Sequence, residues 1–328
     1  MNDLETDSTP DEINIILIDG INLNGSWEKK GRNITAAALS GIAGIGVLYF
    51  YAQSILDTIL VLIFKFGSHA KSPGGFIKDI NISSELKVPL LLALTFSQYV
   101  FMLLPTLWII KKWHTGDVIK YVRICRCKAN EIALAILITI FVLPFCDYIT
   151  TLIQQFFRIP EAYRNLGPKL FTAYSAKEFM LLIFVVAITP AICEELLFRG
   201  YFQRTMERTI GVKSFIVTGV LFGLFHMQPL GLINLSILGI LFSFFYYRSK
   251  SIFPSSAAHF TNNLIALLFL YCQAKSINIG FPVDGKFSAV LIFLSLIIAG
   301  TFVYIYINIT KTQAPIMQMN DEHTNNIE

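Results

Sequence analysis

The sequence has few charged residues, and this shortage excludes most soluble folds. Asp, Glu, Lys and Arg make up 15% of its 328 residues, whereas 54% are hydrophobic, and the mean hydropathy is +0.60. This balance is typical of a polytopic membrane protein. The net charge of +4 is small and dispersed, so it does not indicate binding to nucleic acid. Lipid is therefore the solvent expected for most of the chain.

Cysteine is also scarce, and several catalytic motifs are missing. The five cysteines lack the CxxC pairing of a zinc module and the density of a disulfide scaffold, so most are predicted to be ordinary small apolar residues. Cys125 and Cys127 lie in the basic stretch RICRCK, where lipidation or a thiol function is a minor alternative. There is no HExxH and no GxSxG. Ser255 and Ser256 are interpreted as the start of a helix, which argues against a serine nucleophile.

Long apolar runs dominate what is present. Because a membrane-spanning helix needs roughly 20 apolar residues, the sequence predicts an all-α, polytopic transmembrane bundle of about eight helices. The acidic start MNDLETDSTPDEIN is unlike a signal peptide, so the first run is expected to be an uncleaved membrane helix. The predicted segments are 35–64, 88–110, 132–153, 179–198, 214–228, 230–247, 252–271 and 287–309.

The segments form one predicted membrane domain over residues 31–311, with polar mobile tails at 1–30 and 312–328. HMQPLG separates the fifth and sixth segments by a very short turn, and Gly219 and Gly223 in the fifth have a GxxxG spacing that permits close helix packing. Of the 26 Lys and Arg residues, 16 fall on the face that holds both chain ends. This bias predicts cytoplasmic termini in a plasma or inner membrane.

The stretch AICEELLFRG places Glu194, Glu195 and Arg199 at the end of the fourth run, where a charge costs about 2.5 to 3.5 kcal/mol at the membrane centre. Glu195 and Arg199 are four apart and can pair on one helix face, whereas Glu194 points about 100° away. Arg199 is expected to reach the headgroups from the cytoplasmic helix end. The alternative interpretation is that both glutamates simply cap a helix that ends at Cys193.

Further polar residues interrupt two later runs. His226 lies in one of them, and His259 lies with Asn262 and Asn263 in another. His259 and Asn263 are four apart, so they point the same way. Polar groups facing lipid would remain unsatisfied, and we therefore expect these side chains to converge with the glutamates on one interior site.

Two kinds of peptide-bond hydrolysis fit this set. In the first, a glutamate activates water, and His and Asn side chains stabilise the oxyanion. In the second, a divalent metal such as Zn²⁺ is held by Glu195, His226 and His259. The residue types do not separate the two, so no cofactor is certain.

Three motifs in series, EExxxR at Glu194 to Arg199, FxxxH at Phe222 and His226, and HxxxN at His259 and Asn263, resemble those of the CPBP family. This family of CAAX proteases and bacteriocin-processing enzymes, also called Abi, includes the type 2 CAAX prenyl protease or Ras-converting enzyme. The resemblance covers residues 179–271 and implies a multi-helix intramembrane endopeptidase, described in the family both as a metalloprotease and as a glutamate protease.

The resemblance also implies a role for each site residue. It implies that Glu194 activates water together with His226 and that His259 and Asn263 form the oxyanion site. Glu195 and Arg199 would then support these residues. Its implied partners are membrane lipid and a protein or peptide substrate that can be lipidated. Two other classes are weighed against it: a non-proteolytic immunity or scaffold protein that binds a peptide in the same cavity, and a small transporter with a proton relay. The transporter lacks the repeat symmetry expected of that class.

Overall fold

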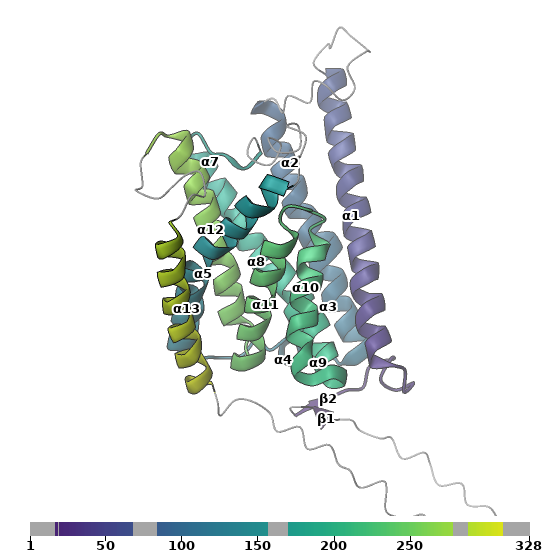
Figure 1. Ribbon diagram of the computed structural model, residues 1–328. Coiled ribbons are helices and arrows are strands. Elements are labelled where there is room, and N and C mark those ends of the chain that lie inside the picture. Colours follow the sequence, from purple (N-terminus) through teal and green to yellow (C-terminus); the bar gives the residue numbers. More distant parts are fainter. Residues whose placement is uncertain (1–16, 19, 68–83, 157–169, 278–287, 311–328) are drawn as a thin grey trace, which may run out of the picture.

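The computed structural model describes residues 17–18, 20–67, 84–156, 170–277 and 288–310, which form an all-α bundle of long helices (Figure 1). The first half of the bundle contains α1 (Ile34–Gly67), a second span made of α2 (Ser84–Ser97), η1 (Gln98–Leu103), α3 (Leu104–Ile109) and η2 (Ile110–His114), the short α4 (Val118–Tyr121) and α5 (Ala129–Phe156). A two-stranded antiparallel pair, β1 (Leu17–Ile18) and β2 (Ile21–Asn22), precedes α1. Elements η1 and η2 are π-helical.

The second half begins with one continuous helical run through residues 176–210. Its parts are α7 (Ala176–Leu182), η3 (Ile183–Ile188), α8 (Thr189–Glu195), η4 (Leu196–Gln203) and α9 (Arg204–Ile210). Elements η3 and η4 are π-helical. The run is followed by η5 (Gly211–Lys213), α10 (Ser214–Phe225), α11 (Leu232–Ser249), α12 (Phe253–Ala274) and α13 (Ala289–Ile309).

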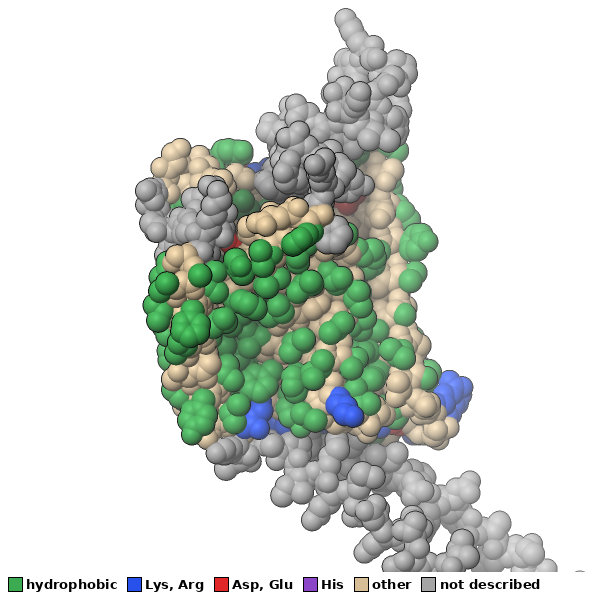
Figure 2. All heavy atoms as spheres, in the orientation of Figure 1, with side chains coloured by type: hydrophobic (Ala, Val, Ile, Leu, Met, Phe, Trp, Pro, Cys, Tyr) green, Lys and Arg blue, Asp and Glu red, His purple; other side chains and the backbone are tan. Residues whose placement is uncertain are grey.

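These helices confirm the predicted all-α polytopic bundle, and six stretches within the described ranges are long and apolar enough to cross a membrane. Apolar side chains are spread over the whole described face in Figure 2, and Lys and Arg lie mainly at its lower rim. The protein is therefore an integral membrane protein. α12 is not among the six, and its 22 residues include the polar FTNN stretch.

Two predicted helix ends were misplaced. The fourth run does not stop near residue 198 but continues through α9 to Ile210, so Glu194 and Glu195 lie inside a helix and do not cap one. The fifth helix, α10, ends at Phe225 after 12 residues, about 18 Å at 1.5 Å per residue. That length is well short of the roughly 30 Å hydrocarbon core, so the chain reverses direction inside the bundle.

Close packing joins α10 to α11 along the predicted GxxxG face. A Cβ atom on Gly219 would overlap the backbone of Ile240, and one on Gly223 would overlap the Ser236 side chain. The packing role predicted for these glycines is thus confirmed.

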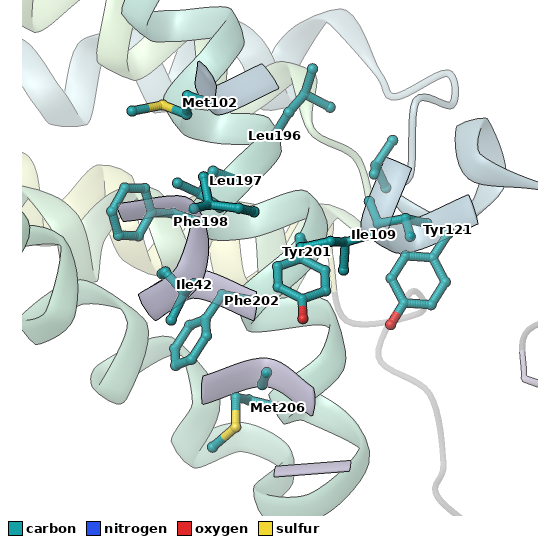
Figure 3. Packing of buried hydrophobic residues seen from close by; sticks show 14 of the residues in the cluster. Ile42, Met102, Ile109, Tyr121, Leu196, Leu197, Phe198, Tyr201, Phe202 and Met206 are labelled. Carbon is teal, nitrogen blue, oxygen red and sulfur yellow. The ribbon is translucent and has the colours of Figure 1, made fainter. Parts of the chain in front are cut away.

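A large apolar cluster surrounds η4 and holds it against the first two spans. Figure 3 shows Phe198, Tyr201 and Phe202 of η4 lying among Ile42 of α1 and Met102 of η1. The Tyr201 hydroxyl donates to the carbonyl of Ala37 at 2.6 Å. Element η4 is therefore embedded in the bundle and does not lie at its lipid-facing surface.

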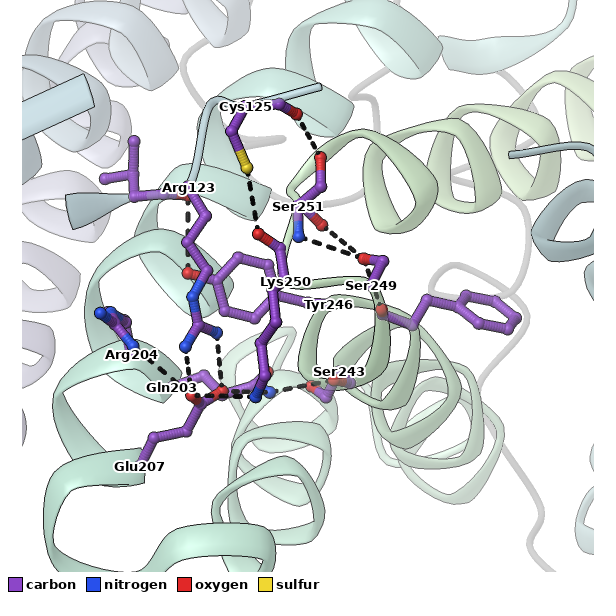
Figure 4. A network of polar contacts seen from close by, with 12 residues as sticks. Arg123, Cys125, Gln203, Arg204, Glu207, Ser243, Tyr246, Ser249, Lys250 and Ser251 are labelled. Atoms are coloured by element: carbon purple, nitrogen blue, oxygen red, sulfur yellow. Dashed lines mark hydrogen bonds and ion pairs between the residues drawn. The ribbon is translucent and has the colours of Figure 1, made fainter. Parts of the chain in front are cut away.

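Polar networks fix the lower end of the bundle. The Glu207 carboxylate accepts two hydrogen bonds from Arg123, at 3.1 and 2.7 Å, and lies 3.8 Å from both Arg204 and Lys250 (Figure 4). Nearby, the Glu28 carboxylate binds Arg208 and His114. Glu28 belongs to the predicted mobile N-terminal tail, so the described end of that segment is packed; residues 1–16 and 311–328 lie outside the described residues.

The five cysteines are free thiols, and three of them, Cys146, Cys193 and Cys272, are buried, as predicted for ordinary apolar residues. Cys125 is exposed, and its Sγ lies 3.2 Å from the carbonyl oxygen of Lys250 (Figure 4). Burial raises the pKa of the Cys127 thiol, which disfavours the reactive thiolate.

Candidate active site

Glu195 and Arg199 form a fully buried ion pair across the α8–η4 junction. The Arg199 Nη1 atom donates to Glu195 Oε1 at 2.6 Å, and both side chains are 0% exposed. Arg199 Nη2 donates to the carbonyl of Gly239 on α11 at 3.0 Å. The predicted pairing is confirmed, but the prediction that Arg199 reaches the headgroups was wrong, because its partners lie inside the bundle.

Three aromatic rings enclose the Arg199 guanidinium. Its Cζ atom lies 4.7 Å from the ring centre of Phe222, 5.6 Å from Phe242 and 5.9 Å from Phe198. A ring face attracts a cation, and more strongly when water is excluded. This enclosure, together with Glu195, explains how a guanidinium persists in the apolar interior.

His259 joins this pair from α12. Its Nδ1 atom lies 2.8 Å from Glu195 Oε1, the oxygen that also accepts from Arg199. Phe242 stacks on the imidazole with ring centres 5.3 Å apart and an interplanar angle of 21°. The ring is therefore fixed with Nε2 directed away from Glu195.

Glu194 points to the other side of the helix, as its sequence offset predicts. Its Oε1 atom accepts a hydrogen bond from Gln98 Nε2 on η1 at 3.3 Å. Its Oε2 atom is buried without a hydrogen-bond partner among the described residues and lies 3.7 Å from His226 Nε2 and 4.0 Å from His259 Nε2. Two histidines, one directly after α10 and one on α12, thus face one carboxylate oxygen.

The partners of the two imidazoles determine their tautomers. His226 Nδ1 lies 2.8 Å from the carbonyl oxygen of Phe222, which can only accept, so Nδ1 carries the proton. The same reasoning applies to His259 Nδ1 beside the Glu195 carboxylate. In the neutral form of each ring, Nε2 is then an acceptor directed toward Glu194 Oε2.

Asn263 lies one helical turn beyond His259 on α12. Its Nδ2 atom donates to the carbonyl of Val186 on η3 at 2.8 Å, and its Oδ1 accepts from Asn262 at 2.9 Å. These bonds link α12 to η3. The Asn263 amide keeps a second N–H beyond the one given to Val186, and its hydrogen bonds within the described part of the chain go to Val186 and Asn262, not to Glu194 or the histidines.

The donor set does not fit the metal site considered from the sequence. Glu195 Oε1 is occupied by Arg199 and by the Nδ1 side of His259, whereas His226 Nε2 faces Glu194. Across the described ranges, no group of three or more His, Cys, Asp or Glu side chains could hold a metal ion. The chemistry derived below therefore uses the side chains alone.

Two contact residues were not predicted. Gln98 lies in an apolar run, and a lone amide within a membrane helix is a signal that could have singled it out. Phe242 gives no such signal, because the sequence has 28 phenylalanines and nothing local marks the one that stacks on His259.

The fold and this site together define a class: an integral membrane protein with an interior carboxylate–histidine site. Residues 176–265 match the family described as type II CAAX prenyl endopeptidase Rce1-like, and this match supports an assignment to the CPBP, or CAAX protease, family, which is a family of proteases. The matched segment contains all three motifs, whereas Gln98 lies outside it. Neither the curated proteins nor the solved structures gave a match.

Proposed function

We propose that the protein is an intramembrane endopeptidase that hydrolyses a peptide bond in a membrane-associated protein or peptide by means of water activated by Glu194. One observation carries the proposal: Glu194 Oε2, which has no hydrogen-bond partner among the described residues, lies opposite the Nε2 atoms of His226 and His259. Because the Nδ1 proton of neutral His226 is committed to the Phe222 carbonyl, His226 Nε2 and Glu194 Oε2 are both acceptors. A water molecule, which offers two O–H donors, matches this pair.

Glu194 is the general base in this proposal. It takes a proton from the water while the water oxygen attacks the carbonyl carbon of the scissile peptide bond, and His226 orients the water through Nε2. The protonated Glu194 then gives this proton to the leaving nitrogen as the C–N bond breaks. The carboxyl group returns to its ionised form, so the proton is conserved through the cycle.

His259 and Asn263 are assigned to the oxyanion. His259 donates to it from Nε2 when the ring carries both protons, with Nδ1–H retained by Glu195. Asn263 supplies its second N–H from one turn further along α12. Donors fixed in advance in a dry site stabilise developing negative charge strongly. Glu195 and Arg199 act through His259 and are positioning residues.

The reversal between α10 and α11 supports access to the site. Residues 226–231 are not helical, and non-helical backbone at membrane depth is tolerated only where protein buries it or water reaches it. Met227 is 68% exposed, and the His226 side chain is 24% exposed. We infer that water and substrate enter past this turn.

The proposal also includes the orientation of the protein in a plasma or inner membrane with cytoplasmic termini. The start of α1 and the end of α13 lie at the same end of the bundle (Figure 1), the end where Lys and Arg gather in Figure 2. Lys and Arg accumulate on the cytoplasmic side of membrane proteins.

The test is cleavage of internally quenched peptides by the full chain in lipid nanodiscs, with each peptide supplied both farnesylated and unmodified. We expect Glu194→Gln and His226→Ala to lose activity by at least about 100-fold, the order found when a general base is removed. Glu178→Gln, on the same helical run but paired with Lys87 at 3.0 Å, is the matched control and should retain activity. Full activity in Glu194→Gln would refute the mechanism, whereas binding without cleavage by the parent would indicate a peptide-binding protein.

A further inference from the structure

Gln98 is the only side chain shown donating a hydrogen bond to Glu194 within the described ranges, and it comes from outside the family-matched segment. It lies on the π-helical η1 and is 4% exposed. Its Nε2 donates to Glu194 Oε1 at 3.3 Å. Its own Oε1 is buried without a hydrogen-bond partner among the described residues, although a buried amide oxygen normally has one.

This contact gives the two carboxylate oxygens of Glu194 different surroundings. Oε1 is held by Gln98, so Oε2 is the oxygen left facing His226 and His259. A carboxylate without such a contact can rotate about its last side-chain bond, which is broad and roughly two-fold. Gln98 thus fixes the plane in which Glu194 presents its basic oxygen.

The orphaned amide oxygen suggests a second role. In the proposed reaction Glu194 alternates between a carboxylate, which only accepts hydrogen bonds, and a carboxylic acid, which also donates one. A primary amide is neutral and carries both a donor and an acceptor. When Glu194 is protonated, a half-turn of the Gln98 amide brings its oxygen to the new hydroxyl.

We propose that Gln98 is a positioning residue that serves both protonation states of Glu194, donating from Nε2 to the carboxylate and accepting at Oε1 from the carboxylic acid. The inference rests on the proposed function. Gln98 itself neither gains nor loses a proton, because the proton moves from water to Glu194 and then to the leaving nitrogen. The π-helical turn is consistent with such a role, since π-turns are frequent at functional sites.

The test is the pH dependence of kcat and KM in the nanodisc peptide assay, with Gln98→Met as the main variant, since it keeps the volume and removes both polar atoms. Loss of a hydrogen bond to a charged group predicts a kcat lower by about 10- to 100-fold, with KM changed little. Gln98→Met removes the bond to each protonation state, but the bond to the ionised carboxylate is the stronger of the two, so the ionised form loses more and the acid limb of the kcat profile should move to higher pH. The titratable or charged groups around Glu194 that could contribute to this limb are Tyr49, Cys193, Arg199, His226 and His259.

Two further variants make the result decisive. Gln98→Glu keeps the shape of the side chain and places a second carboxyl beside Glu194, so the acid limb of its kcat profile should also move to higher pH. If Gln98→Met does not fold, the acid limb of Gln98→Glu is the test of the proposal. Gln203→Met is the control for loss of a buried amide, because Gln203 is fully buried and donates to the carbonyl of Ser243 at 2.9 Å. It should lower the melting temperature without moving the acid limb.

An acid limb that stays at the parent position in a folded Gln98 variant would overturn the inference, whatever happens to kcat. Glu194→Gln measured in the same assay separates the two proposals. If Glu194→Gln remains active, the proposed function fails. If it is inactive and the Gln98 variants keep the parent profile, only the role of Gln98 fails.

Discussion

Replacement of Arg199 by Met should destabilise the protein far more than loss of a surface charge. Both partners of the Glu195–Arg199 pair are 0% exposed, so Arg199→Met leaves a buried carboxylate without its guanidinium and the Gly239 carbonyl without its donor. Breaking such a pair costs about 3 to 5 kcal/mol. At 2 to 4 °C per kcal/mol, the melting temperature should fall by roughly 6 to 20 °C.

Thermal unfolding in detergent is the assay, and a double variant makes it specific. Arg199→Met combined with Glu195→Gln removes both charges, so it should recover much of the lost stability. Lys120→Met is the surface control, because Lys120 and Asp117 lie 3.9 Å apart with side chains 68% and 56% exposed, and such pairs contribute about 0 to 1 kcal/mol. Equal stability of Arg199→Met and the parent would refute the reasoning, and so would a double variant no better than the single one.

Two further predictions concern pH and metal. Burial alone would raise the pKa of Glu28, but hydrogen bonds from Arg208 and His114 outweigh it and hold the value at about 2, below the ordinary 4.5. The resulting stability, at most about 3 kcal/mol, is complete above pH 4.5 and disappears as the pH falls from 4.5 to 2; the melting temperature of Glu28→Gln should therefore fall less over this range than that of the parent. The proposed metal-free mechanism predicts that dialysis against a chelator leaves peptide cleavage unchanged, and restoration of lost activity by Zn²⁺ alone would contradict that mechanism.

The sequence was sufficient for most of the fold because lipid imposes a simple rule on it. Uninterrupted apolar runs must be helices when water is absent, and the eight predicted segments correspond to the observed ones. The rule failed where charges are buried in pairs. A prediction from hydropathy expects a charged residue such as Arg199 to be exposed, so it places the end of the fourth helix there. In the structure, Glu195 and the aromatic rings stabilise Arg199 in the interior, and the helix continues to Ile210.

The site was predictable to the extent that it depends on helix periodicity. The four-residue spacing placed Glu195 against Arg199, and the 100° offset directed Glu194 elsewhere. Which histidine atom faces which carboxylate depends on how α10 and α12 approach α8, and that follows from long-range packing. For the same reason no local pattern connected Gln98 to Glu194, since 96 residues separate them.

The short α10 also has a consequence for how the protein is made. Twelve residues are too few to cross the bilayer as an independent helix, so α10 and α11 should enter the membrane together as one hairpin, already packed through Gly219 and Gly223. His226 lies at the tip of that hairpin and reaches Glu194 only when the hairpin docks on η4. The glutamates therefore enter the membrane before the hairpin that brings His226 to them, so the proposed cleavage requires the hairpin to be docked.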